Sequence, residues 1–140
     1  TIDFSDLGFP STFMCEKQDL LDLYQTLLMK AGAEKLDYIV MEIADGLLQR
    51  ETNFLLKSKE FMSTIHSVVF SCGDSLSAFH GIDLLSDFGI SPAFISGRFT
   101  MSPLLIEEVK LSSGMPVLNM DEIMSGAYNH LLISQKLRAA

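Results

Sequence analysis

Short apolar runs alternate with longer amphipathic stretches along this chain. The apolar runs predict buried strands, and they comprise residues 1–4, 38–42, 66–71, 92–95 and 115–118. Stretches with apolar residues three or four positions apart predict helices, and they comprise residues 16–31, 47–56, 59–65, 75–88, 103–113 and a last helix that begins at 119–122. Because strands alternate with helices, we expect one α/β domain over residues 1–140, in three layers, with helices on both faces of a mostly parallel sheet of about five strands.

Capping residues mark several of the expected helix ends. Glycines are expected to end three helices, at Gly32, Gly89 and Gly114. Asp74 or Ser75 is expected to cap the start of the helix over 75–88, and Ser102 followed by Pro103 is a typical helix start. Asn119 begins a pattern that resembles a capping box. The last helix is expected to bury Met124, Ala127, Tyr128, Leu131 and Leu132.

Acidic, glycine and hydroxyl residues follow the predicted strands. Right-handed crossovers place all the strand-to-helix turns at one edge of a parallel sheet, which is where ligands bind. Glu42 ends the apolar run 38–41, and an acidic residue in that place is typical of a Mg²⁺ ligand. The alternative is that Glu42 and Asp45 only cap the helix that begins near Leu47. The other ligand-binding candidates in these turns are Asp3, Asp6, Asp45, Gly46, Cys72, Gly73, Asp74, Ser96, Gly97 and Arg98.

Composition excludes several functional classes. The net charge of −8 argues against nucleic-acid binding, which needs a basic face. No apolar run reaches the roughly 18 residues of a membrane span, and the chain does not begin with a signal-peptide pattern. Cys15 and Cys72 are far apart, which favours reduced thiols and a cytoplasmic location. The three histidines lack metal-ligand spacing, and the eight methionines are expected to fill the core.

Three stretches together resemble a known family. Asp37 to Leu48 (DYIVMEIADGLL) is similar to the acidic strand of the dethiobiotin-synthetase-like branch of P-loop NTPases. Val68 to Gly97 and Pro103 to Leu118 resemble the strands and helices that follow it in that branch. The resemblance covers about two-thirds of the chain and is greatest to uncharacterised ATP-binding proteins. It implies a Rossmann-like sheet, Mg²⁺ and ATP as cofactors, Glu42 as the Mg²⁺ ligand, and residues 96–102 and 118–121 around the nucleotide base.

The chain departs from this family in two places. It lacks the phosphate-binding loop G-x-x-x-x-G-K-[ST], which cradles the β- and γ-phosphates. Ser96 or Gly97 replaces the asparagine that contacts adenine in the family. We therefore expect the C-terminal part of a larger nucleotide-binding protein, which is inactive alone although the whole protein would be an ATP-dependent ligase or kinase-like enzyme. The alternative is a non-catalytic α/β domain for ligand binding or subunit association.

The absent loop also affects the expected sheet and partners. In the family, the strand that carries the loop lies between the strand of Glu42 and the strand of Val68 to Ser71. Without it, we expect Ile39–Met41 to pair directly with Val68–Phe70, because consecutive strands are usually neighbours. The partners expected are a small-molecule ligand or nucleotide and either a missing N-terminal half or a second copy.

Overall fold

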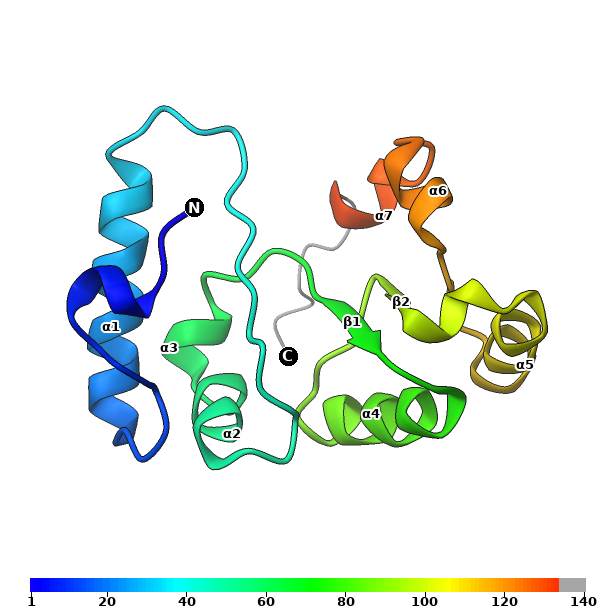
Figure 1. The fold of residues 1–140 in the computed structure, drawn as a ribbon, viewed down its shortest axis with the longest axis horizontal. Coiled ribbons are helices and arrows are strands. Elements are labelled where there is room, and N and C mark those ends of the chain that lie inside the picture. The colour runs from blue at the N-terminus through cyan, green and yellow to red at the C-terminus, as the bar shows by residue number, and fades with distance from the viewer. Residues whose placement is uncertain (134–140) are drawn as a thin grey trace. The chain divides into compact units, whose positions relative to one another are not determined.

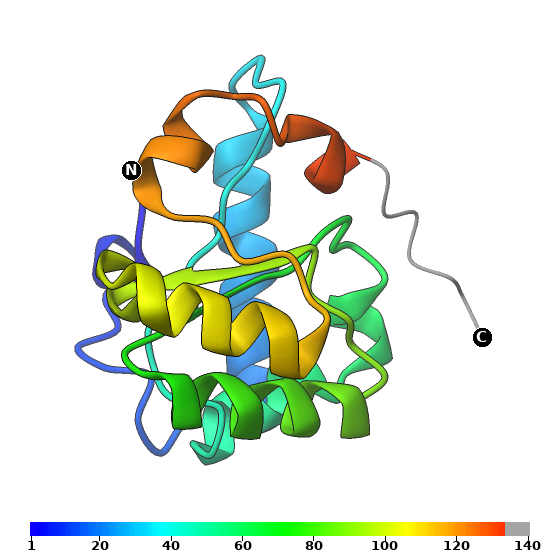
Figure 2. The same ribbon diagram turned by 90° about the vertical axis from the view of Figure 1, so that its right-hand side faces the viewer.

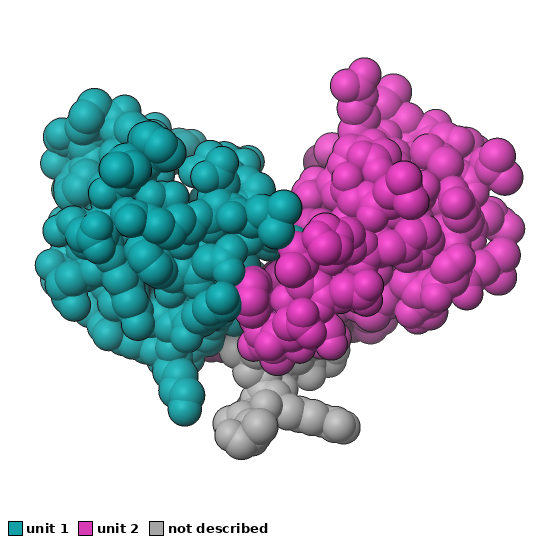
Figure 3. Space-filling model, turned by 90° about the horizontal axis from the view of Figure 1, so that it is seen from below, with its two compact units in different colours: residues 1–63 teal, residues 64–140 magenta. Residues whose placement is uncertain are grey.

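The structure is a computed structural model that describes residues 1–133 and divides into two compact units. The first unit comprises Thr1–Ser63 and the second begins at Thr64, as the two colours of Figure 3 show. The described part of the first unit is helical, whereas the second combines strands and helices (Figure 1).

The first unit is a helical cluster built on one long helix. A 3₁₀ helix, η1 (Phe4–Leu7), precedes α1 (Lys17–Gly32), and α2 (Arg50–Leu56) and α3 (Lys59–Met62) follow. The predicted helix over 16–31 is therefore confirmed within one residue at each end. Its buried face, as predicted, contains Leu20 and Leu23. Phe61 of α3 is 1% exposed, and its ring packs edge-on against Tyr24 of α1 at 4.7 Å between ring centroids.

Two predicted strands of the first unit are absent, and the helix after the second begins late. Residues 1–3 lead into η1, which begins at Phe4, and residues 38–42 have no regular secondary structure and pair with no described strand. The side chains of this apolar run are exposed, with Val40 at 94%. The apolar run suggested burial on both faces, but burial needs a neighbouring strand, and none is present in the described residues. The next helix begins at Arg50 with Gln49 as its N-cap, so the prediction that Asp45 caps a helix near Leu47 is wrong.

The second unit contains most of the elements that the sequence predicts there. Its strands are β1 (Val69–Cys72) and β2 (Phe94–Gly97). Its longer helices are α4 (Ser75–Asp87) and α5 (Pro103–Ser113), and shorter ones are η2 (Arg98–Met101), α6 (Met120–Met124) and α7 (Asn129–Ile133). Asp74 caps α4 as predicted, because its carboxylate accepts the Ser77 amide hydrogen bond at 2.8 Å. Asn119 and Glu122 form the predicted capping box at the start of α6.

The predicted last helix is interrupted. It divides into α6 and α7, and Gly126, with φ of 72°, lies in the left-handed region between them. Four of the five residues predicted to be buried, Met124, Ala127, Tyr128 and Leu132, are exposed, so the prediction is wrong for them, and the fifth, Leu131, is half-buried. The amphipathic spacing continues across this break, which is why the pattern alone suggested a single helix.

The sheet is much smaller than predicted. β1 pairs in parallel with β2, and the register sets Val69 opposite Phe94 and Cys72 opposite Gly97. One further parallel bridge joins Ile95 to Val117, and the Ile95 amide donates to the Pro116 carbonyl at 2.9 Å. The described residues thus form a sheet of two strands with one isolated bridge, which contradicts the expected Rossmann-like sheet of about five strands. The predicted pairing of Ile39–Met41 with Val68–Phe70 is also wrong, because β2 is the strand that pairs with β1.

Apolar side chains cover both faces of β2. Ile95 is fully buried with Ala78 of α4 and Val109 of α5, and Figure 2 shows these two helices side by side. Phe94 belongs to a second cluster, against which Ile123 and Leu131 pack. Because neighbouring strand residues face opposite sides, β2 joins these two clusters. Packing in these two clusters holds β2 in position, and it thereby also positions the loop that follows the carboxyl end of the strand.

One glycine lets α4 approach β1 closely. A Cβ atom at Gly81 would lie less than 3.0 Å from two ring atoms of Phe70. The ring of this β1 residue therefore occupies the space beside the helix where another residue would place its side chain. Gly81 is buried, in keeping with this contact.

Among residues 1–133, no helix combines the length and the apolar character needed to cross a membrane.

Candidate functional site

The carboxyl ends of β1 and β2 bring six predicted site residues to one end of the sheet. The parallel register sets Cys72 opposite Gly97, and the strand ends therefore lie side by side. The six residues are Cys72, Gly73, Asp74, Ser96, Gly97 and Arg98. The carboxyl end of parallel strands is the edge at which α/β proteins bind ligands.

Hydrogen bonds fix the loops at this edge. The Ser96 hydroxyl donates to the Leu118 carbonyl at 2.7 Å, which joins the end of β2 to the segment before α6. The Thr100 hydroxyl donates to the Gly97 carbonyl at 2.8 Å and closes the first turn of η2. The loop over 96–101 is therefore held at both its beginning and its end.

Gly97 is required by both its backbone conformation and its surroundings. Its φ of 120° lies in the region that favours glycine, and ψ is −168°. A Cβ atom here would lie less than 3.0 Å from the carbonyl oxygen and the amide nitrogen of Cys72. Only glycine allows β2 to end this close to β1, so the residue fixes the shape of the site.

A pocket of about 410 Å³ lies beyond the end of β2. It is lined by Ser96, Gly97, Arg98, Thr100, Met101 and Met120. The candidates chosen by residue type lack the last three, because methionine side chains carry no strong hydrogen-bonding group and Thr100 was not singled out. The methionines were expected in the core, but Met101 is 84% exposed and Met120 is 68% exposed. Thr100, Met101 and Met120 all lie within residues 96–102 and 118–121, for which the resemblance implies contacts with a base, and that role stays a prediction.

The other residues at this edge are held in structural interactions. Burial and, to a lesser extent, the nearby Asp74 carboxylate together raise the pKa of the Cys72 thiol to about 11. This thiol is therefore protonated at neutral pH, and it does not gain thiolate character from the helix that follows. The backbone and side-chain hydrogen bonds from Ser77 lower the pKa of Asp74, which acts as the cap of α4.

The pocket suits a flat aromatic ligand. Its lining is mostly apolar, and methionine sulfur makes favourable contacts with aromatic rings. Arg98 is exposed in the wall, where its planar guanidinium can stack on a ring or donate to an acceptor. The volume lies within the range of about 300–1,000 Å³ that small-molecule sites occupy.

Asp3 and Asp6, in the first unit, serve as caps. The Asp3 carboxylate accepts the Ser5 amide at 2.7 Å, and the Asp6 carboxylate accepts the Asp3 amide at 2.9 Å. Hydrogen bonds from the side chain and the backbone of Ser5 lower the pKa of Asp3. Both acids are thus used in starting η1.

Glu42, Asp45 and Gly46 lie in the exposed segment between α1 and α2. Among residues 1–133, no hydrogen bond or ion pair joins Glu42 or Asp45 to another residue. The same residues contain no group of three or more histidine, cysteine, aspartate or glutamate side chains that could hold a metal ion. The described part of the chain therefore offers Glu42 as a single carboxylate.

Comparisons of this chain with protein-family models, with curated proteins and with solved structures found no match.

Proposed function

We propose that this chain is the base-binding, C-terminal part of an ATP-binding protein of the P-loop NTPase type and is inactive alone. The observation that carries the proposal is the pocket lined by Ser96, Gly97, Arg98, Thr100, Met101 and Met120. These residues belong to the two loops that the family resemblance assigns to the base. An apolar pocket with an arginine at its wall is chemically suited to a purine ring. The whole protein would be an ATP-dependent enzyme of the ligase or kinase class.

The phosphates and Mg²⁺ would be held largely by the rest of that protein. The chain has no phosphate loop, which provides backbone amides and a lysine to the β- and γ-phosphates. Mg²⁺ is usually held by one or two carboxylates together with substrate phosphates. Glu42 is one such carboxylate by resemblance, but the described residues do not surround it with further ligands. We therefore assign no catalytic step to this chain.

The test is a titration of the isotope-labelled chain with adenosine and with Mg-ATP, followed by NMR amide shifts. We expect both ligands to shift the amides of residues 96–101 and 120, with dissociation constants above roughly 10 μM, or about −7 kcal/mol. The two constants should agree within about threefold, because the base supplies most of the contact at this pocket. A dissociation constant for Mg-ATP below about 10 μM would overturn the proposal. So would a titration in which the amide signals of residues 96–101 and 120 do not shift.

Two methionines of α6 provide a matched pair of variants. Met120 lines the pocket, whereas Met124 lies outside it, and both are well exposed. Met120→Glu should weaken adenosine binding at least about tenfold by placing a charge in the apolar wall. Met124→Glu adds the same charge to the same helix and should leave binding unchanged. Equal effects of the two substitutions would argue against this pocket as the base site.

A second candidate function is subunit association, and the exposed apolar segment favours it. This segment comprises Tyr38, Ile39, Val40 and Met41, which are 40–94% exposed and have no regular secondary structure. Four consecutive exposed apolar residues with unpaired backbone groups are typical of a strand that pairs with another chain. Sedimentation velocity over a range of concentrations tests this role. An oligomer that Val40→Lys dissociates would support it, and a monomer at all concentrations would exclude self-association.

A further inference from the structure

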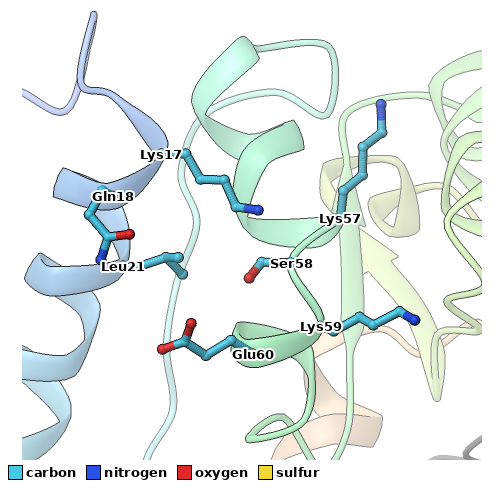
Figure 4. Close-up of a pocket in the computed structure, with 7 residues that line it drawn as sticks. All are labelled: Lys17, Gln18, Leu21, Lys57, Ser58, Lys59 and Glu60. Carbon is cyan, nitrogen blue, oxygen red and sulfur yellow. The ribbon is translucent and has the colours of Figure 1, made fainter.

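A hollow of about 650 Å³ on the first unit lies between the start of α1 and the connection from α2 to α3 (Figure 4). Its lining comprises Lys17, Gln18, Leu21, Lys57, Ser58, Lys59 and Glu60. Three of these seven residues are lysines. This grouping stands out in a chain with 18 acidic and 10 basic residues.

The short connection between α2 and α3 places Lys57 and Lys59 on either side of the buried Ser58 in the sequence. Lys57 is the C-cap of α2, and Ser58 caps the start of α3 by accepting the Phe61 amide at 3.4 Å. The Ser58 amide donates to the Leu55 carbonyl at 2.9 Å, which makes the connection tight. Ser58 is only 3% exposed, so the two lysines beside it, Lys57 and Lys59, flank a polar floor.

The charged residues that line this hollow are mostly basic. In Figure 4, the Lys17 ammonium group extends from α1 toward Ser58, whereas the Lys57 and Lys59 side chains point away from Ser58 and from α1. Lysine stems are long and flexible, and those of Lys17 and Lys59 are exposed, so they can turn toward a bound group. Glu60 is the acidic residue of the lining, and its carboxylate accepts the Gln25 amide at 2.6 Å. With three lysines and one glutamate, the lining residues carry a net charge of +2, which favours an anion.

We propose that this hollow binds a phosphate-bearing anion, such as the diphosphate group of a small metabolite. Lys17 and Lys59 would each contribute a charged donor, and the Ser58 hydroxyl would contribute a neutral one from the floor. Leu21 forms an apolar wall suited to the uncharged part of such a ligand. This site is separate from the pocket at the end of β2, and it does not depend on the function proposed there.

Pyrophosphate is the probe, added to the isotope-labelled chain at constant ionic strength and followed by NMR amide shifts. We expect saturable shifts at residues 17–18 and 57–60, with a dissociation constant on the order of 1 mM, because exposed ion pairs are individually weak. Sodium chloride added to the same ionic strength should not reproduce them. Shifts that rise linearly without saturation, or that chloride reproduces, would overturn the proposal.

Two double variants with equal charge changes locate the site. Lys17→Gln with Lys59→Gln should weaken pyrophosphate binding at least about fivefold. Lys30→Gln with Lys35→Gln removes two exposed lysines of the same unit that do not line the hollow, and it should leave binding unchanged. Equal weakening in both variants would show general attraction by charge and would refute a built site.

Discussion

Replacing Gly97 with alanine should strongly destabilise the second unit. The loss should exceed that at glycines of this unit whose added methyl group would meet only open space, such as Gly89. Two costs combine at this residue. The backbone conformation, with φ of 120° and ψ of −168°, costs a residue with a side chain about 1–3 kcal/mol. The added methyl group would also meet the Cys72 backbone, which is held in the β1–β2 ladder and cannot rotate away.

The magnitude follows from these two costs. Forcing a group into filled space typically costs about 1–3 kcal/mol. Together with the conformational cost, we expect Gly97→Ala to lower the free energy of unfolding by about 2–6 kcal/mol. A typical domain has only about 5–15 kcal/mol in total. At a typical urea dependence of about 2 kcal/mol per molar, the unfolding midpoint should fall by about 1–3 M.

The assay must report on the second unit itself, since the two units can unfold separately. Urea unfolding by circular dichroism should therefore be combined with hydrogen exchange of the Ile95 amide, which is bonded to Pro116. Gly89→Ala is the matched control. Gly89 has φ of 73° but no atom near its missing side chain, so only about 1–2 kcal/mol of conformational cost is expected. Equal losses in the two variants would refute the close approach of β2 to β1.

Two further predictions concern ionisable groups of the same unit. Because the pKa of the Cys72 thiol is raised to about 11, its alkylation by iodoacetamide at pH 7 should be on the order of 100-fold slower than that of an ordinary thiol. The alkylation rate, measured by mass spectrometry, should increase up to about pH 11. Ordinary reactivity at pH 7 would contradict the burial of this thiol. Because the pKa of Asp74 is lowered in the folded protein, its stabilising effect is fully present above about pH 5 and is lost as the pH falls through the folded pKa. In urea unfolding, the Asp74→Asn variant should therefore lose less stability than the wild type between about pH 5 and pH 2. Identical losses in the two proteins would contradict this contribution.

Local signals predicted the second unit well, because each acts over a few residues. The Asp74 carboxylate caps α4, Pro103 begins α5 and Gly114 ends it in the left-handed conformation. Each interaction is made within one turn of the helix concerned. The short strands near Val69 and Phe94 were also predicted within three residues at either end, since buried apolar runs with glycine or aspartate after them leave few alternatives.

The sheet and the exposed surfaces depend on distant residues, and there the sequence was misleading. Tyr38–Met41 has the composition of a buried strand, but composition does not supply a neighbour with which to pair. Methionine is an apolar residue that usually lies in the core, yet Met101 and Met120 are exposed and line an open pocket. The candidate site was found in part because strand ends were predictable, whereas its apolar walls required the fold.

The exposed Tyr38–Met41 run has a consequence for handling the protein at different pH and salt concentrations. A short apolar segment of high β-propensity without charge or proline is a template for cross-β aggregation. The net charge of −8 opposes contact between chains, and this repulsion vanishes near the isoelectric point of about 4.7. Salt shortens its range to about 10 Å at 0.1 M and about 3 Å at 1 M. Precipitation should therefore be fastest in acidic buffer near that point and, at neutral pH, should accelerate as salt is added.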